Sequence, residues 1–108
     1  MRVLILDDMQ VRHDAFAKIF SDHTVVHCLN YSDYLVAVRD GFDVVCLDHD
    51  INEEQRNGVD AADQLVWATK GKTLPRVIVH STNMVGAAKM VAMLRDAGFD
   101  VKAIPFLF

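Results

Sequence analysis

The sequence predicts an α/β fold with a doubly wound parallel sheet of five strands in the order 2-1-3-4-5. Two observations carry this prediction. Short apolar runs, of the kind found in strands buried on both faces, alternate along the chain with segments of helical periodicity. The chain has 108 residues, which suits a single domain over residues 1–108. Strands that alternate with helices form parallel sheets with right-handed crossovers, and five such steps in a short chain are typical of the flavodoxin-like order.

The first half of the chain contains three of the expected strands. They are predicted over residues 2–6, 23–29 and 43–48, where apolar residues dominate. A helix is expected over residues 10–20, because apolar side chains recur there at helical spacing. A second helix is expected from Ser32, a favourable N-cap residue, through Val38, with Gly41 ending it.

The second half of the chain repeats the pattern but has no final helix. A third helix is expected after Gly58, and a fourth, capped by residues 81–83, ends near Ala97. Strands are expected over residues 76–80 and 99–104, followed by Pro105 and the apolar tail 106–108. Without the usual last helix, part of one sheet face stays uncovered. We expect either a homodimer through this uncovered face or a tail that folds back over it.

Composition and charge exclude several classes of function. The formal net charge of −4 argues against charge-driven binding to duplex DNA, which needs a dense lysine and arginine surface. No apolar run is long enough to span a membrane, and the N-terminus enters a strand at once, unlike a signal peptide. Cys28 and Cys46 lie in apolar runs and are expected to be buried free thiols, as in a reducing compartment. We therefore expect a cytoplasmic protein.

Polar side chains follow three strands that are neighbours in the predicted order. They are Asp7-Asp8 after the first strand, Asp48-His49-Asp50 after the third, and His80-Ser81 with Asn83 after the fourth. Ligand sites in such sheets lie beyond the carboxyl ends of the strands. We therefore expect these three clusters to converge at one edge of the sheet.

The converging acids predict a metal site next to a phosphate site. Carboxylates in a small volume repel one another unless a cation or a proton lies between them. Carboxylate oxygens suit Mg²⁺ or Mn²⁺, so we predict a divalent metal ion on Asp7, Asp8 and Asp48, with Asp50 as a further contact. The N–H groups of the helix that begins near Asn83 favour a bound phosphate at the same place.

Histidines and an arginine near these acids suit proton transfer and phosphate binding. His49 and His80 are predicted to act as general acid and base, or as metal ligands. Arg12 could pair with the acids or bind phosphate, and His13 faces either the site or solvent. His27 belongs to the expected edge strand and should lie on the surface.

The chain resembles response-regulator receiver domains over nearly its whole length. The resemblance rests on Asp7-Asp8, on Asp48, on Gly58 and on Ser81. It implies a receiver-like fold, Mg²⁺ on the three aspartates and a phosphoryl acceptor at Asp48. Ile104, however, occupies the position where receivers carry a lysine that contacts the phosphate, which argues against phosphorelay signalling.

The added histidines make the chain similar to one subgroup, the cyclic-phosphate-processing receiver-like domains. The matching stretches are Leu6-Asp7-Asp8 with Arg12-His13 and Phe16, Leu47-Asp48-His49-Asp50, and Val79-His80-Ser81 with Asn83, Gly86, Ala87 and Met90. The resemblance implies processing of a cyclic phosphate, such as the 2′,3′-cyclic phosphate of an RNA end or of a nucleotide.

The leading hypothesis is a metal-dependent phosphoesterase. The metal ion would activate a water molecule, His80 or His49 would take its proton, and the other would protonate the leaving ribose oxygen. Asp48 could instead act as a nucleophile. The phosphate would be held by Ser81, Asn83, Arg12 and His13. The alternative is a receiver-type signalling module or a cyclic-nucleotide-binding module without catalysis.

Overall fold

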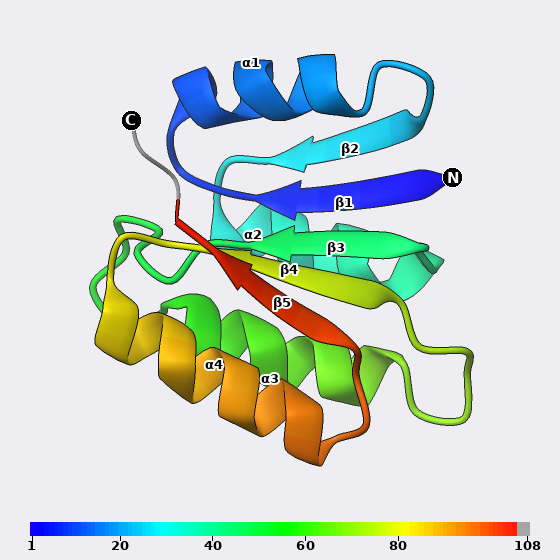
Figure 1. Ribbon diagram of the computed structural model, residues 1–108, viewed down its shortest axis with the longest axis vertical. Coiled ribbons are helices and arrows are strands. Elements are labelled where there is room, and N and C mark those ends of the chain that lie inside the picture. Colours follow the sequence, from blue (N-terminus) through cyan, green and yellow to red (C-terminus); the bar gives the residue numbers. More distant parts are fainter. Residues whose placement is uncertain (106–108) are drawn as a thin grey trace.

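The computed structural model describes residues 1–105, which contain a five-stranded parallel sheet (Figure 1). The strands are β1 (Arg2–Leu6), β2 (Thr24–Cys28), β3 (Val44–Leu47), β4 (Arg76–His80) and β5 (Val101–Ile104). Their order is β2-β1-β3-β4-β5, and each neighbouring pair is parallel. The predicted fold and strand order are confirmed, although some strands are one or two residues shorter at their ends than expected.

Helices cover both faces of the sheet. They are α1 (Gln10–Ile19), α2 (Tyr31–Ala37), α3 (Gly58–Ala68) and α4 (Met84–Asp96), with a 3-10 turn, η1 (Val38–Asp40), after α2. Figure 1 shows α1 on one face of the sheet and α3 and α4 on the other. Leu4 and Leu6 of β1 belong to the core shared with α2, α3 and α4. Val3 and Ile5 point to the opposite face and pack with Phe16 of α1, because side chains alternate along a strand.

One predicted helix start is wrong. α2 begins at Tyr31, and its N-cap is Asn30 rather than Ser32. Asn30 has an extended backbone, and its Oδ1 accepts a hydrogen bond of 2.8 Å from the backbone N–H three residues later. Tyr31 is buried, so the core extends the helix one residue upstream of Ser32. The predicted cap of α4 is confirmed, because Asn83 Oδ1 accepts a hydrogen bond of 2.9 Å from Gly86 N.

The sheet face that carries α1 is incompletely covered. β5 ends at Ile104, and no helix follows it within residues 1–105. A groove of about 320 Å³ opens on this face next to the half-buried Ile78. The predicted fold-back of the tail concerns residues 106–108, which lie outside the described residues. The homodimer through this face stays a prediction.

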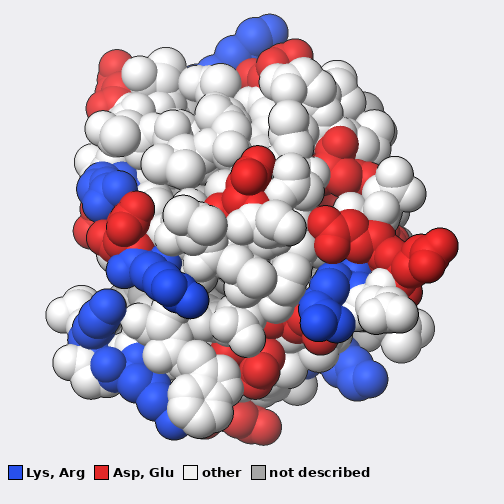
Figure 2. Space-filling model, turned by 180° about the vertical axis from the view of Figure 1, so that it is seen from behind, with Lys and Arg blue, Asp and Glu red and all other residues white. Residues whose placement is uncertain are grey.

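Charge and cysteine chemistry follow the composition. Figure 2 shows basic and acidic side chains interspersed over the face seen from behind, without a continuous basic field. Cys28 and Cys46 are buried free thiols, and burial raises the pKa of Cys28 to about 11 and the pKa of Cys46 to about 12. They are buried core thiols, as predicted, and their raised pKa values disfavour the reactive thiolate. Among the helices described over residues 1–105, none has both the length and the apolar character needed to cross a membrane.

Candidate metal and phosphate site

Strand register brings three chemically active residues into one row. Leu47 of β3 pairs with Leu6 of β1 on one side and with Val79 of β4 on the other. Asp7, Asp48 and His80 each come one residue later, so they form the next row, at the carboxyl ends of three neighbouring strands. Because side chains alternate along a strand, this row faces the side of the sheet that carries α1.

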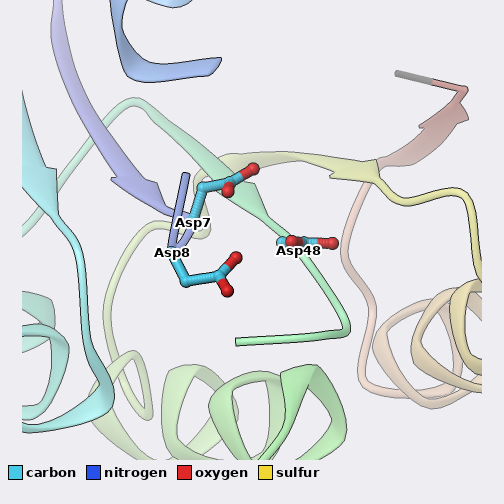
Figure 3. Close-up of side chains that lie close together, drawn as sticks. All are labelled: Asp7, Asp8 and Asp48. Carbon is cyan, nitrogen blue, oxygen red and sulfur yellow. The ribbon is translucent and has the colours of Figure 1, made fainter. Parts of the chain in front are cut away.

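Three carboxylates lie together at this edge of the sheet (Figure 3). Carboxylate oxygens of Asp7, Asp8 and Asp48 come within 4.8 Å of one another. Asp7 and Asp48 are buried, and Asp8 is half-buried. The structure thus brings together three of the four aspartates predicted to bind metal. Asp50 is not part of this group, because its side chain is 63% exposed and its carboxylate pairs with His49.

A guanidinium group is built into the acid cluster. Arg12, in the first turn of α1, donates from Nη1 to Asp7 Oδ2 at 3.3 Å and to Asp48 Oδ2 at 3.1 Å. Arg12 is 8% exposed, so both ion pairs are shielded from water. Of the two roles that the sequence left open for Arg12, the structure shows the pairing with the acids.

Burial and repulsion separate the pKa values of the three carboxyl groups. Burial and the charge of Asp7 raise the pKa of Asp48 to about 7, despite the nearby Arg12. The same two causes raise the pKa of Asp8. Burial alone would raise the pKa of Asp7, but hydrogen bonds from His80 and from a backbone N–H, with the charge of Arg12, lower it. The cluster therefore favours an additional proton or a cation.

His80 is fully buried and is bonded to Asp7. Its Nε2 donates to Asp7 Oδ2 at 2.9 Å, and its ring meets the Phe16 ring edge-on with centroids 4.8 Å apart. Nε2 carries the proton, since an ionised carboxylate only accepts hydrogen bonds. Burial lowers the pKa of His80 and outweighs the raising effect of Asp7, so the ring is neutral at pH 7. In this geometry His80 orients the carboxylate of Asp7.

His49 belongs to the loop after β3 and packs against the first turn of α4, in surroundings unlike those of His80. Its Nδ1 lies 2.7 Å from Asp50 Oδ1, and Asn83 Nδ2 lies 3.2 Å from the same nitrogen and 3.4 Å from Asp50 Oδ1. Asp50 accepts hydrogen bonds from both groups, so His49 Nδ1 carries a proton. The two histidines predicted to act as acid and base are thus held by different carboxylates, one exposed and one buried.

Two glycines make room for the loop that follows β3. A Cβ atom at Gly86 would lie 2.6 Å from His49 Nε2, and a Cβ atom at Gly58 would lie 2.6 Å from Met90 Sδ and 2.7 Å from His49 Cα. Neither glycine has a positive φ. Close packing of the loop against α3 and α4, rather than backbone conformation, therefore requires glycine at both places.

Gly86→Ala is expected to displace the His49 ring and to lower the free energy of unfolding by about 1–3 kcal/mol, because the added methyl group overlaps the ring. Urea unfolding and the NMR resonances of the His49 ring measure the two effects. Lys89→Ala, on an exposed position of the same helix, is the control and should leave both unchanged. Unshifted His49 resonances in Gly86→Ala would contradict this packing.

Of the two places that the sequence left open for His13, solvent is excluded, and the ring contacts the backbone of Asp7 rather than its carboxylate. Its ring is buried, its Nε2 donates to the backbone oxygen of Asp7 at 2.8 Å, and its Nδ1 lies 2.7 Å from Nδ1 of His27. Because a carbonyl only accepts, His13 Nε2 carries the proton, and in the neutral pair His27 donates from Nδ1. His27 is exposed, as predicted, but sequence reasoning missed this link to the site. The sequence feature that could have indicated this link is the position of His27 opposite Ile5, which precedes Asp7 by two residues and faces the same side of the sheet.

Ser81 and Asn83 form the start of α4. Ser81 is 7% exposed, and its Oγ accepts a hydrogen bond of 3.0 Å from Asn83 N. With Asn83 capping α4, the first N–H groups of this helix lie at the carboxyl end of β4, where the helix dipole favours an anion. Asn83 therefore caps α4, Ser81 bonds to the backbone N–H of this cap residue, and a phosphate contact of either residue stays a prediction.

Comparisons with known proteins agree with this fold. The family model of the cyclic-phosphate processing receiver domain matches residues 2–96. No curated protein matches the chain. A CheY-like response regulator receiver domain protein from Methanospirillum hungatei JF-1 superimposes with a TM-score of 0.73 at 16% identity, over 99% of this chain and 82% of that chain.

Two other solved structures show how much of a longer protein the chain resembles. A response regulator from Burkholderia pseudomallei, with a phosphorylated aspartic acid, a calcium ion and citrate, matches at a TM-score of 0.72 and 16% identity, over 96% of this chain and 58% of that chain. NtrX from Brucella abortus in complex with ADP matches at 0.77 and 21%, over 99% of this chain and 24% of that chain. At these identities the likeness shows the fold, and the chain spans little more than half of the Burkholderia protein.

Proposed function

The chain belongs to the family of cyclic-phosphate processing receiver domains, and we propose that it is a metal-dependent phosphoesterase that opens a cyclic phosphate. The observation that carries the proposal is the group of three carboxylates within 4.8 Å of one another, next to the strand end from which α4 starts. A cation site beside a helix N-terminus suits the charge of a phosphodiester. The proposed substrate is the 2′,3′-cyclic phosphate of a nucleotide or of an RNA end.

The donor set suits a hard divalent ion such as Mg²⁺ or Mn²⁺. The carboxylate oxygens of the three aspartates lie within 4.8 Å of one another, so a hard divalent ion could draw them together. Burial and the charge of Asp7 raise the pKa of Asp48 to about 7, so a cation beside these carboxylates would be favourable. Asp7, Asp8 and Asp48 would hold the ion, which supplies Lewis-acid polarisation of the phosphate. The Burkholderia response regulator contains a calcium ion and a phosphorylated aspartic acid, which supports a divalent ion in this fold.

The chain's own side chains would move the proton and hold the phosphate. In the hydrolysis, the water oxygen bonds to phosphorus and the bond from phosphorus to one ribose oxygen breaks. The water loses one proton, and the leaving ribose oxygen gains one. We assign the water's proton to His49 Nε2, because Asp50 binds the opposite ring nitrogen and leaves Nε2 to accept it. His80 acts through Asp7 as a positioning residue. Ser81 and the first N–H groups of α4 would bind phosphate oxygens.

A receiver-type signalling module is the alternative. In receivers a lysine before the proline contacts the phosphate, but here Ile104 lies at this place, opposite His80. Lys102 lies opposite Ile78, so its backbone is about 7 Å further from the site along the strand. Among the described residues, no ion pair joins Lys102 to the aspartates. These features support the enzyme over phosphorelay.

Turnover of 2′,3′-cyclic nucleotides with Mg²⁺ or Mn²⁺ tests the proposal. We expect formation of a phosphomonoester product, and we expect this reaction to require the metal ion. His49→Gln is expected to lower kcat by about 10²–10⁴-fold, the usual contribution of a positioned acid or base. His23→Gln, at the opposite end of the sheet, is the matched control and should keep wild-type rates. Metal-independent turnover, or undiminished turnover in His49→Gln, would contradict the mechanism. Acceptance of phosphate from acetyl phosphate without turnover would favour the signalling module.

A further inference from the structure

A groove between α4 and β5 begins at the candidate site and runs away from it. Its volume is about 570 Å³, and its walls are mostly apolar. Ser81 lies at one end, the small side chain of Ala87 forms part of the α4 wall, and Arg95 and Lys102 lie towards the other end. Of these residues, the proposed hydrolysis uses Ser81 alone.

We propose that this groove binds the terminal nucleotides of a single-stranded RNA whose 2′,3′-cyclic phosphate lies at Ser81, an inference that rests on the proposed function. Pockets of this size and apolar character suit small organic groups such as nucleosides. Ala87 and Ala88 are small side chains on the α4 wall, which leaves room for a base, and Pro105 lies on the β5 side. Met84 is 83% exposed at the groove, and its flexible thioether packs well against aromatic rings.

The length of the groove favours an RNA strand over a single nucleotide. Arg95 follows Met84 by eleven residues in α4, and this distance is about 16 Å along the helix axis. Stacked nucleotides advance by about 3.4 Å each. The groove is therefore longer than one nucleoside and reaches a point where the strand's 5′-side phosphates would pass.

Positive charge at the far end complements those phosphates. Arg95 and Lys102 line the groove of a chain whose net charge is −4, and Lys102, on the edge strand β5, also lines the groove on the opposite face of the sheet. Arg95 Nη2 donates to Val101 O at 3.2 Å, which holds the guanidinium group beside β5. A guanidinium group has five N–H donors in a planar fork and matches a phosphate well. The positive charge is thus local and lies in line with the candidate site.

Comparison of two substrates tests the groove. Arg95→Gln is expected to lower kcat/KM about tenfold for a four-nucleotide RNA with a terminal 2′,3′-cyclic phosphate, because one charged contact is lost. The kcat/KM for 2′,3′-cyclic AMP should stay unchanged. Arg95→Lys should retain most of the activity on RNA, and Lys89→Gln, an exposed lysine of α4 outside the groove, should change neither value. Equal losses on both substrates, or no loss on RNA, would overturn the proposal.

A binding experiment separates failure of the groove from failure of the enzyme. The same RNA with a terminal 3′-phosphate is titrated by fluorescence anisotropy in Mg²⁺ at several salt concentrations. Arg95→Gln should weaken binding and reduce the slope of log K against log salt by about 0.7, the value for one phosphate contact on a single strand. If this holds while neither substrate is turned over, the groove stands and the proposed enzyme fails. RNA that binds wild type and Arg95→Gln equally, or binds neither, overturns the groove.

Discussion

Asp48→Asn is expected to abolish metal-dependent turnover and, at the same time, to stabilise the metal-free protein at pH 8. The side chain of Asp48 is 2% exposed, and its oxygens lie close to those of Asp7 and Asp8. Its negative charge is therefore maintained against both burial and repulsion. Asparagine keeps the shape of the side chain and removes the charge. The same change removes one of three proposed metal ligands, so activity should fall to background.

The pH dependence of this stabilisation follows from the raised pKa of Asp48. That pKa is about 7 in the folded protein, compared with an ordinary value of 3.8, so at intermediate pH the folded state holds a proton that the unfolded chain has lost. The stability from this group is fully present below about pH 4 and is lost as the pH rises through 7. The penalty at pH 8 is roughly 4 kcal/mol. A weaker bond to Arg12 offsets part of the variant's gain.

Urea unfolding in EDTA between pH 4 and pH 8 measures this effect as the difference between wild type and Asp48→Asn. The difference is needed because other groups also titrate, and His80, with its lowered pKa, has the opposite pH dependence. Asp63→Asn, an exposed aspartate of α3, is the matched control and should show little change. Calorimetry with Mg²⁺ tests the ligand role. A variant less stable than wild type at pH 8, or one with wild-type affinity for Mg²⁺, would contradict this account.

The fold and the acid cluster were predictable because both depend on local sequence features. Apolar runs of four to six residues, each ending in polar residues, identify the buried strands. The carboxyl ends of neighbouring parallel strands lie at one edge of the sheet, so Asp7-Asp8 and Asp48 meet there independently of how the helices pack. The wrong cap at Ser32 shows the limit of local reasoning. Asn30 and Ser32 are both good caps, and the burial of Tyr31 in the core decides between them.

The roles of the histidines were not predictable, because they depend on side-chain directions beyond the strand ends. His80 still belongs to β4, so strand alternation turns it towards Asp7. His49 follows the end of β3 and packs against α4. The positions of the strand ends alone would place His49 and His80 together, although their side chains lie in different surroundings. The direction of His13 depends on the rotation of α1 about its axis, which packing of Phe16 against the sheet determines.

Arg12→Met is expected to make the fold depend on a divalent ion. The guanidinium group bonds to Asp7 and Asp48 at 3.3 Å and 3.1 Å in a buried site. Removing one partner of a buried ion pair leaves an uncompensated charge and costs about 3–5 kcal/mol. Methionine retains an apolar chain of similar reach, so the loss reports on charge more than on a cavity. We expect a loss in this range in EDTA at pH 8, and a smaller loss at pH 5, where Asp48 is mostly protonated.

The response of Arg12→Met to Mg²⁺ tests whether the ion and the guanidinium group neutralise the same carboxylates. If they do, saturating Mg²⁺ should restore more stability to the variant than it adds to wild type, since the ion binds the folded state and relieves the unpaired charge. Urea unfolding with EDTA and with Mg²⁺ measures both increments, and Arg12→Lys, which keeps the charge, should retain most of the stability in EDTA. An equal loss with and without Mg²⁺ would show that Arg12 acts by packing. That result would remove the electrostatic argument that Asp7, Asp8 and Asp48 require a cation between them.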